Sequence, residues 1–142
     1  MCGIAGIVSL NGINPRDIRK MSHVLKHRGP DDEGFVLINS LGETTYCKGV
    51  DTISRFSDLQ DISGVTSTKN SIGLVHRRLS ILDLSPAGHQ PMEFGKGLYH
   101  IVFNGEIYNF QEIKSELISY GDRKSTRLNS SHIQKSRMPS SA

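Results

Sequence analysis

Hydrophobic residues of this chain gather into short runs separated by turn signals, a pattern that predicts strands. Residues 2–10 (CGIAGIVSL) form an apolar run that stops at Asn11-Gly12, a strong turn dipeptide, as a buried strand would. Further strands are predicted over residues 35–38, 44–47, 71–75 and 98–103. The strands at 35–38 and 44–47 are expected to pair as a hairpin over the turn at residues 39–42.

Two segments follow helical spacing, one early and one late. Asn14 is placed to cap an early helix that has Pro15 at its first position. The inward face of this helix is formed by residues at helical spacing, Ile18, Met21, Ser22 and Leu25. The late helix is expected to begin near Asn109.

In the late helix, Asn109 and Glu112 have the spacing of a capping box. Phe110, Ile113 and Leu117 then supply an apolar stripe. Strands mostly follow one another, with helices only near the two ends of the pattern. This order predicts an α+β fold rather than an alternating α/β one.

Several segments read as connections. Residues 27–34 (HRGPDDEG) cannot continue the early helix, because two glycines and Pro30 interrupt it. Residues 48–70 are polar without a clear period and are expected to form a surface excursion. Pro86, Gly88 and Pro91 mark a further loop.

Length and composition fit one globular domain. The chain has 142 residues, of which 36% are hydrophobic and 22% charged. No apolar run approaches the roughly 20 residues that a membrane-spanning helix needs. The start of the chain lacks the basic region and cleavage site of a signal peptide. These features predict a cytoplasmic protein without a membrane partner.

Charge is distributed unevenly along the chain. The formal net charge is +3, yet five of the 17 Lys and Arg residues lie within residues 123–142, which contain no acidic residue. Residues 1–122 therefore carry 12 basic and 14 acidic side chains. The net charge of this part is −2, so we expect no nucleic-acid partner.

Residues 123–142 differ in character from the rest. They are Ser-rich, basic and nearly free of apolar side chains, which predicts disorder. They also resemble translated adapter or vector sequence. We therefore expect the native domain to span residues 1–122 and the tail to be non-native.

The two cysteines, Cys2 and Cys47, are expected to be free thiols. Neither belongs to a C-x-x-C pair or to a Cys/His cluster with zinc spacing. Cys47 lies in a strand-like run, where a small thiol side chain simply packs. Neither residue predicts a metal site.

Cys2 carries the strongest chemical signal. If Met1 is removed, this residue offers a thiol and a free α-amino group, with ordinary pKa values of about 8.5 and about 7.7–8.0. Near neutral pH the amine can then act as the base that activates the thiol. This is the arrangement of an N-terminal nucleophile.

Four motifs extend this signal through the chain. MCGIAGI, HRGPDDEG, HRRLSILDLSPAGHQPM and FNGEIYN occur in this order. Together they resemble the class II glutamine amidotransferase domain of glutamine-hydrolysing asparagine synthetases, from Met1 to about Gly121. The resemblance implies the four-layer αββα sandwich of N-terminal-nucleophile hydrolases, truncated here at its C-terminal side.

The resemblance also assigns catalytic roles. Cys2 would attack the side-chain amide of L-glutamine, releasing ammonia and leaving a γ-glutamyl thioester that water hydrolyses. Asn104, through its side chain, and Gly105, through its backbone N–H, match the family's oxyanion hole. Glycine suits this position because it lets the backbone approach closely.

Further matches concern glutamine binding. Arg78 matches the arginine that holds the substrate α-carboxylate, for which a planar guanidinium fork is well suited. Glu106 matches the acidic residue near the α-ammonium group. The backbone beside Arg78 would line the same pocket, through Leu79, Ser80, Ile81 and Leu82.

Other charged and imidazole groups receive structural interpretations. We expect Arg77 to be a solvated cation. His27, His76 and His89 fit no metal-ligand spacing, so structural hydrogen bonds are expected and no metal is. Residues 28–32 are expected to order loops around the pocket.

The sequence departs from the family pattern at its end. The family has a Ser-Asp-Thr-Glu-like stretch after the late helix, and its aspartate, which binds the substrate ammonium, is absent here. The synthetase domain, which would bind ATP and Mg²⁺ and use the ammonia to convert aspartate to asparagine, is also absent. We therefore expect an incomplete glutaminase without a cofactor of its own; a homodimer is compatible with the resemblance.

Two alternatives remain open. An amidotransferase of the same class could deliver ammonia to another acceptor, as glucosamine-6-phosphate synthase and phosphoribosylpyrophosphate amidotransferase do, although RRLSILD and NGEIYN look more like asparagine synthetase. Alternatively, the chain could be a non-catalytic remnant that only binds glutamine. Retention of Met1 would favour the second alternative, because it blocks the amine of Cys2.

Overall fold

A computed structural model describes residues 1–81 and 84–121. The strands and helices of the first 80 residues are β1 (Gly3–Val8), α1 (Pro15–Leu25), β2 (Asp32–Asn39), β3 (Thr44–Lys48), β4 (Gln60–Asp61) and β5 (Asn70–Arg78). They are followed by β6 (Met92–Phe94), β7 (Tyr99–Ile101) and α2 (Phe110–Ser119). The described chain divides into two compact units, the first made of residues 1–80 and 89–104, the second of residues 81, 84–88 and 105–121.

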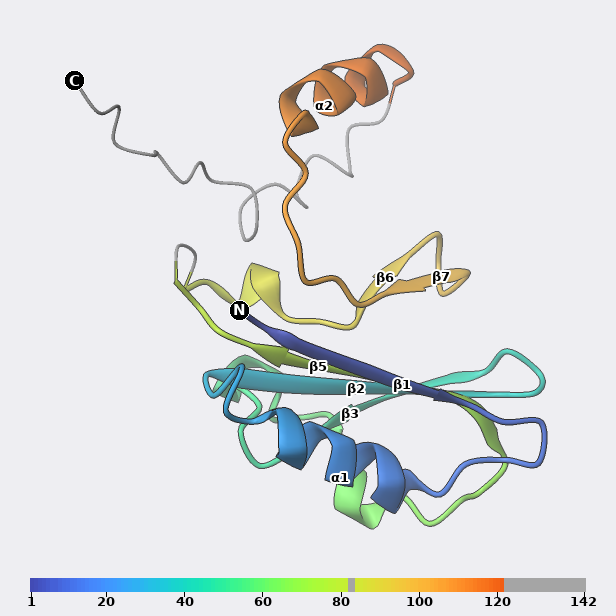
Figure 1. The fold of residues 1–142 in the computed structure, drawn as a ribbon. Coiled ribbons are helices and arrows are strands. Elements are labelled where there is room, and N and C mark those ends of the chain that lie inside the picture. Colours follow the sequence, from blue (N-terminus) through green and yellow to red (C-terminus); the bar gives the residue numbers. More distant parts are fainter. Residues whose placement is uncertain (82–83, 122–142) are drawn as a thin grey trace. The chain divides into compact units, whose positions relative to one another are not determined.

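The first unit is organised by a five-stranded sheet in the order β1-β5-β2-β3-β4 (Figure 1). Its pairs are antiparallel except for the short parallel pair β3–β4. The predicted hairpin is confirmed, since β2 and β3 pair from Phe35↔Cys47 to Ile38↔Thr44. β5 lies between β1 and β2, so its residues contact two strands at once.

Helix α1 covers one face of this sheet and begins where the sequence predicts. The Asn14 side chain accepts a hydrogen bond from the Arg16 N–H at 3.0 Å, and Pro15 occupies the first position. Ile18 and Ser22 are buried on its inward face. Asparagine and proline determine this start locally. The asparagine side chain satisfies a backbone N–H of the first turn that has no partner within the helix, and proline has no N–H that needs a partner.

The hydrophobic core lies between α1 and the sheet. Its buried members are Ile13, Ile18, Phe35, Leu37, Cys47, Ile62 and Val75. Ile62 belongs to a short 3₁₀ helix within residues 48–70, so the expectation of a pure surface excursion is wrong for that residue. One apolar side chain in a polar segment anchors it against the core.

Two strands extend beyond their predicted limits. β2 begins at Asp32 rather than Phe35, and β5 runs on through Arg78. The charged residues that obscured these ends are paired across the sheet, Asp32 opposite Arg78 and Glu33 opposite Arg77. Cross-strand pairs of opposite charge stabilise a sheet, although the charged end of each strand, taken alone, is typical of a loop.

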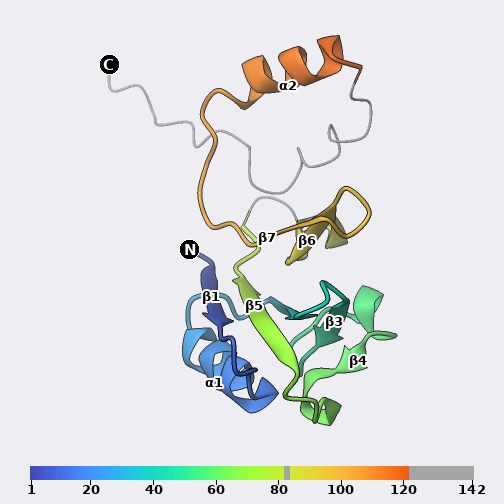
Figure 2. The same ribbon diagram turned by 90° about the vertical axis from the view of Figure 1, so that its right-hand side faces the viewer.

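A small hairpin, β6–β7, lies on the side of the sheet away from α1 in both views (Figures 1 and 2). The predicted strand 98–103 corresponds to β7, and β6 was not anticipated. The Tyr46 hydroxyl and His100 Nδ1, 2.7 Å apart, join β3 to this hairpin.

The second unit contains α2. Its position is as predicted, but Asn109 makes no capping bond through its side chain, so the expected capping box is absent. No residue of α2 is buried, although Ile113 and Leu117, on the predicted apolar stripe, are only 38% and 39% exposed. The observed mixture of sheets and separate helices confirms the α+β class. Within residues 1–81 and 84–121, no helix has the length and apolarity required to cross a bilayer.

Candidate active site

Cys2 lies directly before β1, at the end of the sheet where β5 finishes. The β1–β5 register pairs Gly3 with Arg77, which brings Cys2 level with Arg78 at the end of β5. Both are largely buried, with exposed fractions of 5% for Cys2 and 2% for Arg78. Two residues 76 positions apart in the sequence thus become neighbours through strand pairing.

The sulfur of Cys2 contacts the backbone of the residue after Arg78. The Leu79 N–H donates to Sγ at 3.3 Å, and Sγ lies 3.8 Å from the Leu79 carbonyl oxygen. These two contacts hold the thiol against the end of β5. The predicted nucleophile, Cys2, therefore contacts the backbone of the residue that directly follows Arg78, the predicted carboxylate-binding arginine.

The main-chain carbonyl of Cys2 receives two side-chain donors. Asn104 Nδ2 donates to it at 3.0 Å, and Arg28 Nε donates at 3.4 Å. A carboxamide NH₂ carries two N–H donors, and this bond uses one of them. The Asn104 amide is thus fixed beside Cys2 with a second N–H that the bond does not use.

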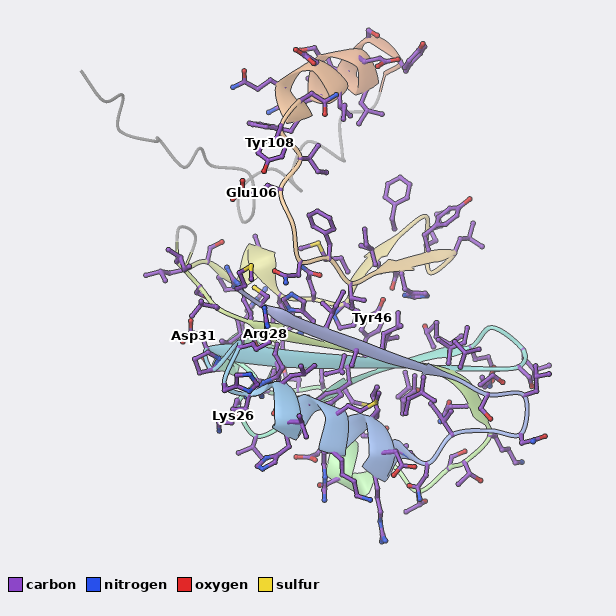
Figure 3. The ribbon with its side chains drawn as sticks, viewed as in Figure 1. Lys26, Arg28, Asp31, Tyr46, Glu106 and Tyr108 are labelled. Carbon is purple, nitrogen blue, oxygen red and sulfur yellow. The ribbon has the colours of Figure 1, made fainter. Side chains whose placement is uncertain are left out.

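The HRGPDD segment is fastened to the same end of the sheet. Gly29 passes so close to β5 that an added Cβ would lie 2.3 Å from the Arg77 carbonyl carbon, which explains the glycine. Asp31 accepts from the Ser80 N–H at 2.7 Å through Oδ2, while its own N–H donates to the Arg78 carbonyl at 3.0 Å. Figure 3 shows Arg28 and Asp31 at this end of the sheet. These bonds order the chain on both sides of Arg78.

Histidines near the site make structural contacts. His89 Nδ1 lies 2.7 Å from Asp32 Oδ2, and the His89 ring stacks on Phe56 with centroids 4.0 Å apart. His27 Nδ1 lies 2.9 Å from the Val24 carbonyl oxygen. Among residues 1–81 and 84–121, no group of three or more His, Cys, Asp or Glu side chains could hold a metal ion.

The predicted site residues fall into three groups. Cys2, Arg78, Leu79, Ser80 and Asn104 lie in the first unit. Ile81, Gly105 and Glu106 belong to the second unit. Leu82 lies outside the described residues.

The expectation that Arg77 is solvated is wrong. Its side chain is 1% exposed, and its guanidinium donates from Nη1 to Glu33 Oε2 at 2.7 Å and from Nη2 to Asp51 Oδ2 at 2.9 Å. Ser22 on α1 also donates to Glu33 Oε2 at 2.7 Å. The acidic partners lie 44 and 26 residues away in the sequence, so no local pattern revealed them.

Asp51, whose side chain is 21% exposed, extends this ion-pair network from the buried Arg77 toward the surface. Lys26 Nζ donates to its Oδ1 at 2.8 Å. Burial acts to raise the pKa of Asp51, but hydrogen bonds and charge from Lys26 and Arg77 outweigh it and hold the pKa below its ordinary value. The network lines a cleft of about 840 Å³ beside α1.

Cys47 is a packed core thiol. It is fully buried, and burial, helped by the nearby Asp61 carboxylate, raises its pKa to about 11. Both cysteines are free, as predicted. Cys47 is therefore protonated at neutral pH and chemically inert by comparison with an accessible thiol.

Gln90 lies near this site, although the sequence did not predict it as a site residue. Its side chain is buried and bonds the backbone of Phe103, the residue before Asn104. The only local signal was its place in the HQPM stretch of the third motif. The spacing of residues in the sequence does not predict a hydrogen bond between a buried side-chain amide and a backbone group 13 residues away.

Comparison with known proteins identifies the class of domain. A family profile described as "Glutamine amidotransferase domain" matches residues 1–45 and 54–133. The chain belongs to this family of glutamine amidotransferase domains. A comparison with solved structures finds no significant match.

Curated relatives are longer proteins. The chain is 38% identical over 132 residues to Putative asparagine synthetase (glutamine-hydrolyzing) 2 of Methanocaldococcus jannaschii, covering 82% of this chain and 20% of that protein. It is 29% identical to Asparagine synthetase (glutamine-hydrolyzing) 1 of Bacillus subtilis, covering 85% and 15%. It is 30% identical to Amidase chry2 of Gibberella zeae, covering 82% and 15%. The chain thus spans a fifth or less of each of these relatives.

Proposed function

We propose that this domain hydrolyses the side-chain amide of L-glutamine with Cys2 as the nucleophile. The observation that carries the proposal is the 3.0 Å bond from Asn104 Nδ2 to the Cys2 carbonyl. It holds a carboxamide donor beside Cys2, which combines a thiol with an N-terminal amine once Met1 is removed. Membership of the glutamine amidotransferase family supports glutamine as the substrate.

The reaction begins after removal of Met1, which frees the Cys2 amine. This amine takes the thiol proton, and Sγ attacks the amide carbon of glutamine. The tetrahedral oxyanion collapses, the ammonium returns its proton to the leaving nitrogen, and ammonia departs. Water, deprotonated by the same amine, then attacks the γ-glutamyl thioester, so that glutamate leaves and the thiol is restored.

The oxyanion needs donors placed in advance. Asn104 would supply its second Nδ2–H and Gly105 its backbone N–H. One such donor typically contributes about 2.7–4 kcal/mol to catalysis. Both donors would come from adjacent residues of the FNGE stretch.

Substrate binding would involve the residues around Arg78. Its guanidinium would hold the α-carboxylate, with backbone groups of residues 79–82 beside it and Glu106 at the α-ammonium group. Asp31 supports this arrangement, because its bonds to Ser80 and Arg78 fix the backbone there. An arginine whose main chain is fixed loses less conformational freedom on binding.

We further propose that the ammonia serves an ATP- and Mg²⁺-dependent synthetase domain of a longer protein, which converts aspartate to asparagine. The names of the relatives from M. jannaschii and B. subtilis support this acceptor. A relative from G. zeae is not named as an asparagine synthetase but as Amidase chry2, so an amidotransferase with another acceptor is the second candidate. A glutamine-binding domain without catalysis is the remaining alternative.

The fold proposal is an N-terminal-nucleophile sandwich of four layers, αββα. Helix α1 and the five-stranded sheet would form two of them. Ile4 and Val8, 45% and 76% exposed, alternate with the inward Ala5 and Ile7 and leave an apolar face opposite α1. A second sheet packed on this face would bury them.

A glutaminase assay tests the proposed function. We expect the chain without Met1 to convert glutamine to glutamate and ammonia, and Cys2→Ala to abolish the reaction. The chain that retains Met1 is the matched control, because it keeps the thiol and lacks the amine. Equal hydrolysis by Cys2→Ala and the parent chain would refute the proposed mechanism.

A further inference from the structure

The dipeptide His89-Gln90, here called the brace, is fixed on the sheet by its first residue. His89 pairs with Asp32 at 2.7 Å and stacks on Phe56. Gly34 of β2 lies directly beneath, where an added Cβ would be 2.2 Å from the Gln90 carbonyl oxygen. The brace therefore sits against β2 with no room for a side chain between them.

The second residue of the brace, Gln90, forms two hydrogen bonds with the backbone of Phe103. Gln90 Oε1 accepts from the Phe103 N–H at 2.6 Å, and Gln90 Nε2 donates to the Phe103 carbonyl at 3.2 Å. One primary amide thus satisfies both polar groups of Phe103, as a neighbouring strand would. The Gln90 side chain is only 2% exposed, so water competes little for these bonds.

The hydrogen bond from Gln90 to the Phe103 carbonyl constrains the backbone of Asn104. The Phe103 carbonyl belongs to the peptide unit that joins Phe103 to Asn104, so the Gln90 bond orients the plane from which Asn104 departs. The Asn104 side chain then reaches the Cys2 carbonyl at 3.0 Å. A continuous series of contacts runs from β2 through the brace to the amide beside the nucleophile.

We propose that Gln90 is a positioning residue for the oxyanion donor Asn104. This inference rests on the proposed function, in which Asn104 binds the tetrahedral oxyanion. Gln90 acts through its two bonds to the polar groups of Phe103. Its loss therefore affects the steps that develop an oxyanion and leaves other reactions of Cys2 unchanged.

Two reactions of Cys2 separate this role from a general structural one. Glutamine hydrolysis passes through an oxyanion, whereas alkylation by iodoacetamide displaces iodide at a saturated carbon and forms none. We expect Gln90→Leu to lower kcat for glutamine about 100-fold and to leave KM within about threefold. The rate of Cys2 alkylation stays at the parent value.

The matched control is Gln60→Leu, the same replacement at an exposed glutamine of β4, which should change neither rate. Gln90→Glu keeps an acceptor for the Phe103 N–H but lacks the donor for the Phe103 carbonyl, so its kcat should fall between those of the parent and Gln90→Leu. An unchanged kcat in Gln90→Leu, or equal losses in hydrolysis and alkylation, would overturn the proposal.

Hydrogen exchange provides a readout independent of glutamine. In Gln90→Leu the Phe103 N–H loses its acceptor and should exchange at least about tenfold faster, and the Asn104 NH₂ resonances should shift. If the parent chain fails to hydrolyse glutamine, the proposed function falls. The Phe103 exchange and the Asn104 shift then decide the positioning role, and unchanged values reject it.

Discussion

Arg77 and Glu33 form a buried ion pair across β5 and β2, with Nη1 and Oε2 2.7 Å apart and side chains 1% and 8% exposed. The pair faces α1, where Ser22 donates a further bond to the same carboxylate oxygen. Arg78, the next residue, has the opposite direction in the pleated strand. Consecutive arginines of one strand thus point to opposite faces of the sheet, Arg77 toward the face that α1 covers and Arg78 away from it.

Replacement of one member of the Arg77–Glu33 ion pair should destabilise the folded protein. We expect Arg77→Met to lower the free energy of unfolding by about 3–5 kcal/mol, because it leaves the Glu33 carboxylate buried without its cation. Urea denaturation measures this change. The double variant Arg77→Met/Glu33→Gln should recover part of the loss, and a double variant less stable than Arg77→Met would argue against the ion pair as the cause.

Asp51 makes the same network sensitive to acid. Its pKa is lowered in the folded protein, so its stabilising contribution is present above its unfolded pKa and is lost as the pH falls below about 4. We expect unfolding midpoints measured from pH 6 to pH 3 to fall less in Asp51→Asn than in the parent chain. A parallel fall in both would show that Asp51 does not carry this dependence.

Arg78 is expected to act mainly in substrate binding. Arg78→Lys keeps the charge and loses the planar fork, so KM for glutamine should rise about 10–100-fold while kcat changes little. Steady-state kinetics separate the two constants. A large fall in kcat at unchanged KM would place Arg78 in the chemical step and contradict its proposed role.

Cys47 should distinguish itself from Cys2 by its reactivity. Its raised pKa keeps it protonated in the folded chain up to about pH 11, whereas an unfolded thiol ionises near pH 9. Iodoacetamide at pH 8 should therefore label Cys2 first and Cys47 only upon unfolding. Peptide mapping reads the order, and early labelling of Cys47 would contradict its burial.

The same shift sets an alkaline limit on stability. A thiol whose pKa is raised by folding contributes stability below its unfolded pKa, and this contribution is lost as the pH rises from about 9 to about 11. Cys47→Val should show a weaker alkaline decline. Equal declines would exclude Cys47 as a source of the dependence.

The sequence predicted those parts of the fold that depend on neighbouring residues. Asn14 and Pro15 fix the start of α1 locally, and the turn after Asn39 fixes the hairpin register. Arg77 could not be placed, because its burial depends on acidic residues far along the chain. The same holds for Ile62, whose polar surroundings conceal a core contact made only in the folded unit.

The candidate site divides in a similar way. Cys2, Arg78 and Asn104 were identified by motif resemblance, and strand pairing accounts for the proximity of the first two. Gln90 escaped notice because its partner is a backbone peptide group, which no side-chain pattern records. Residues that position others through the main chain become visible only when the fold is known.

The proposed mechanism requires that Cys2 forms a covalent γ-glutamyl intermediate. Rapid acid quenching of the Met1-free chain with glutamine, followed by intact mass and peptide mapping, tests it directly. We expect a γ-glutamyl thioester on Cys2 that is absent from Cys47 and does not form in Cys2→Ala. Glutamine hydrolysis with the acyl group on another residue would contradict it, as would undiminished hydrolysis by Cys2→Ala.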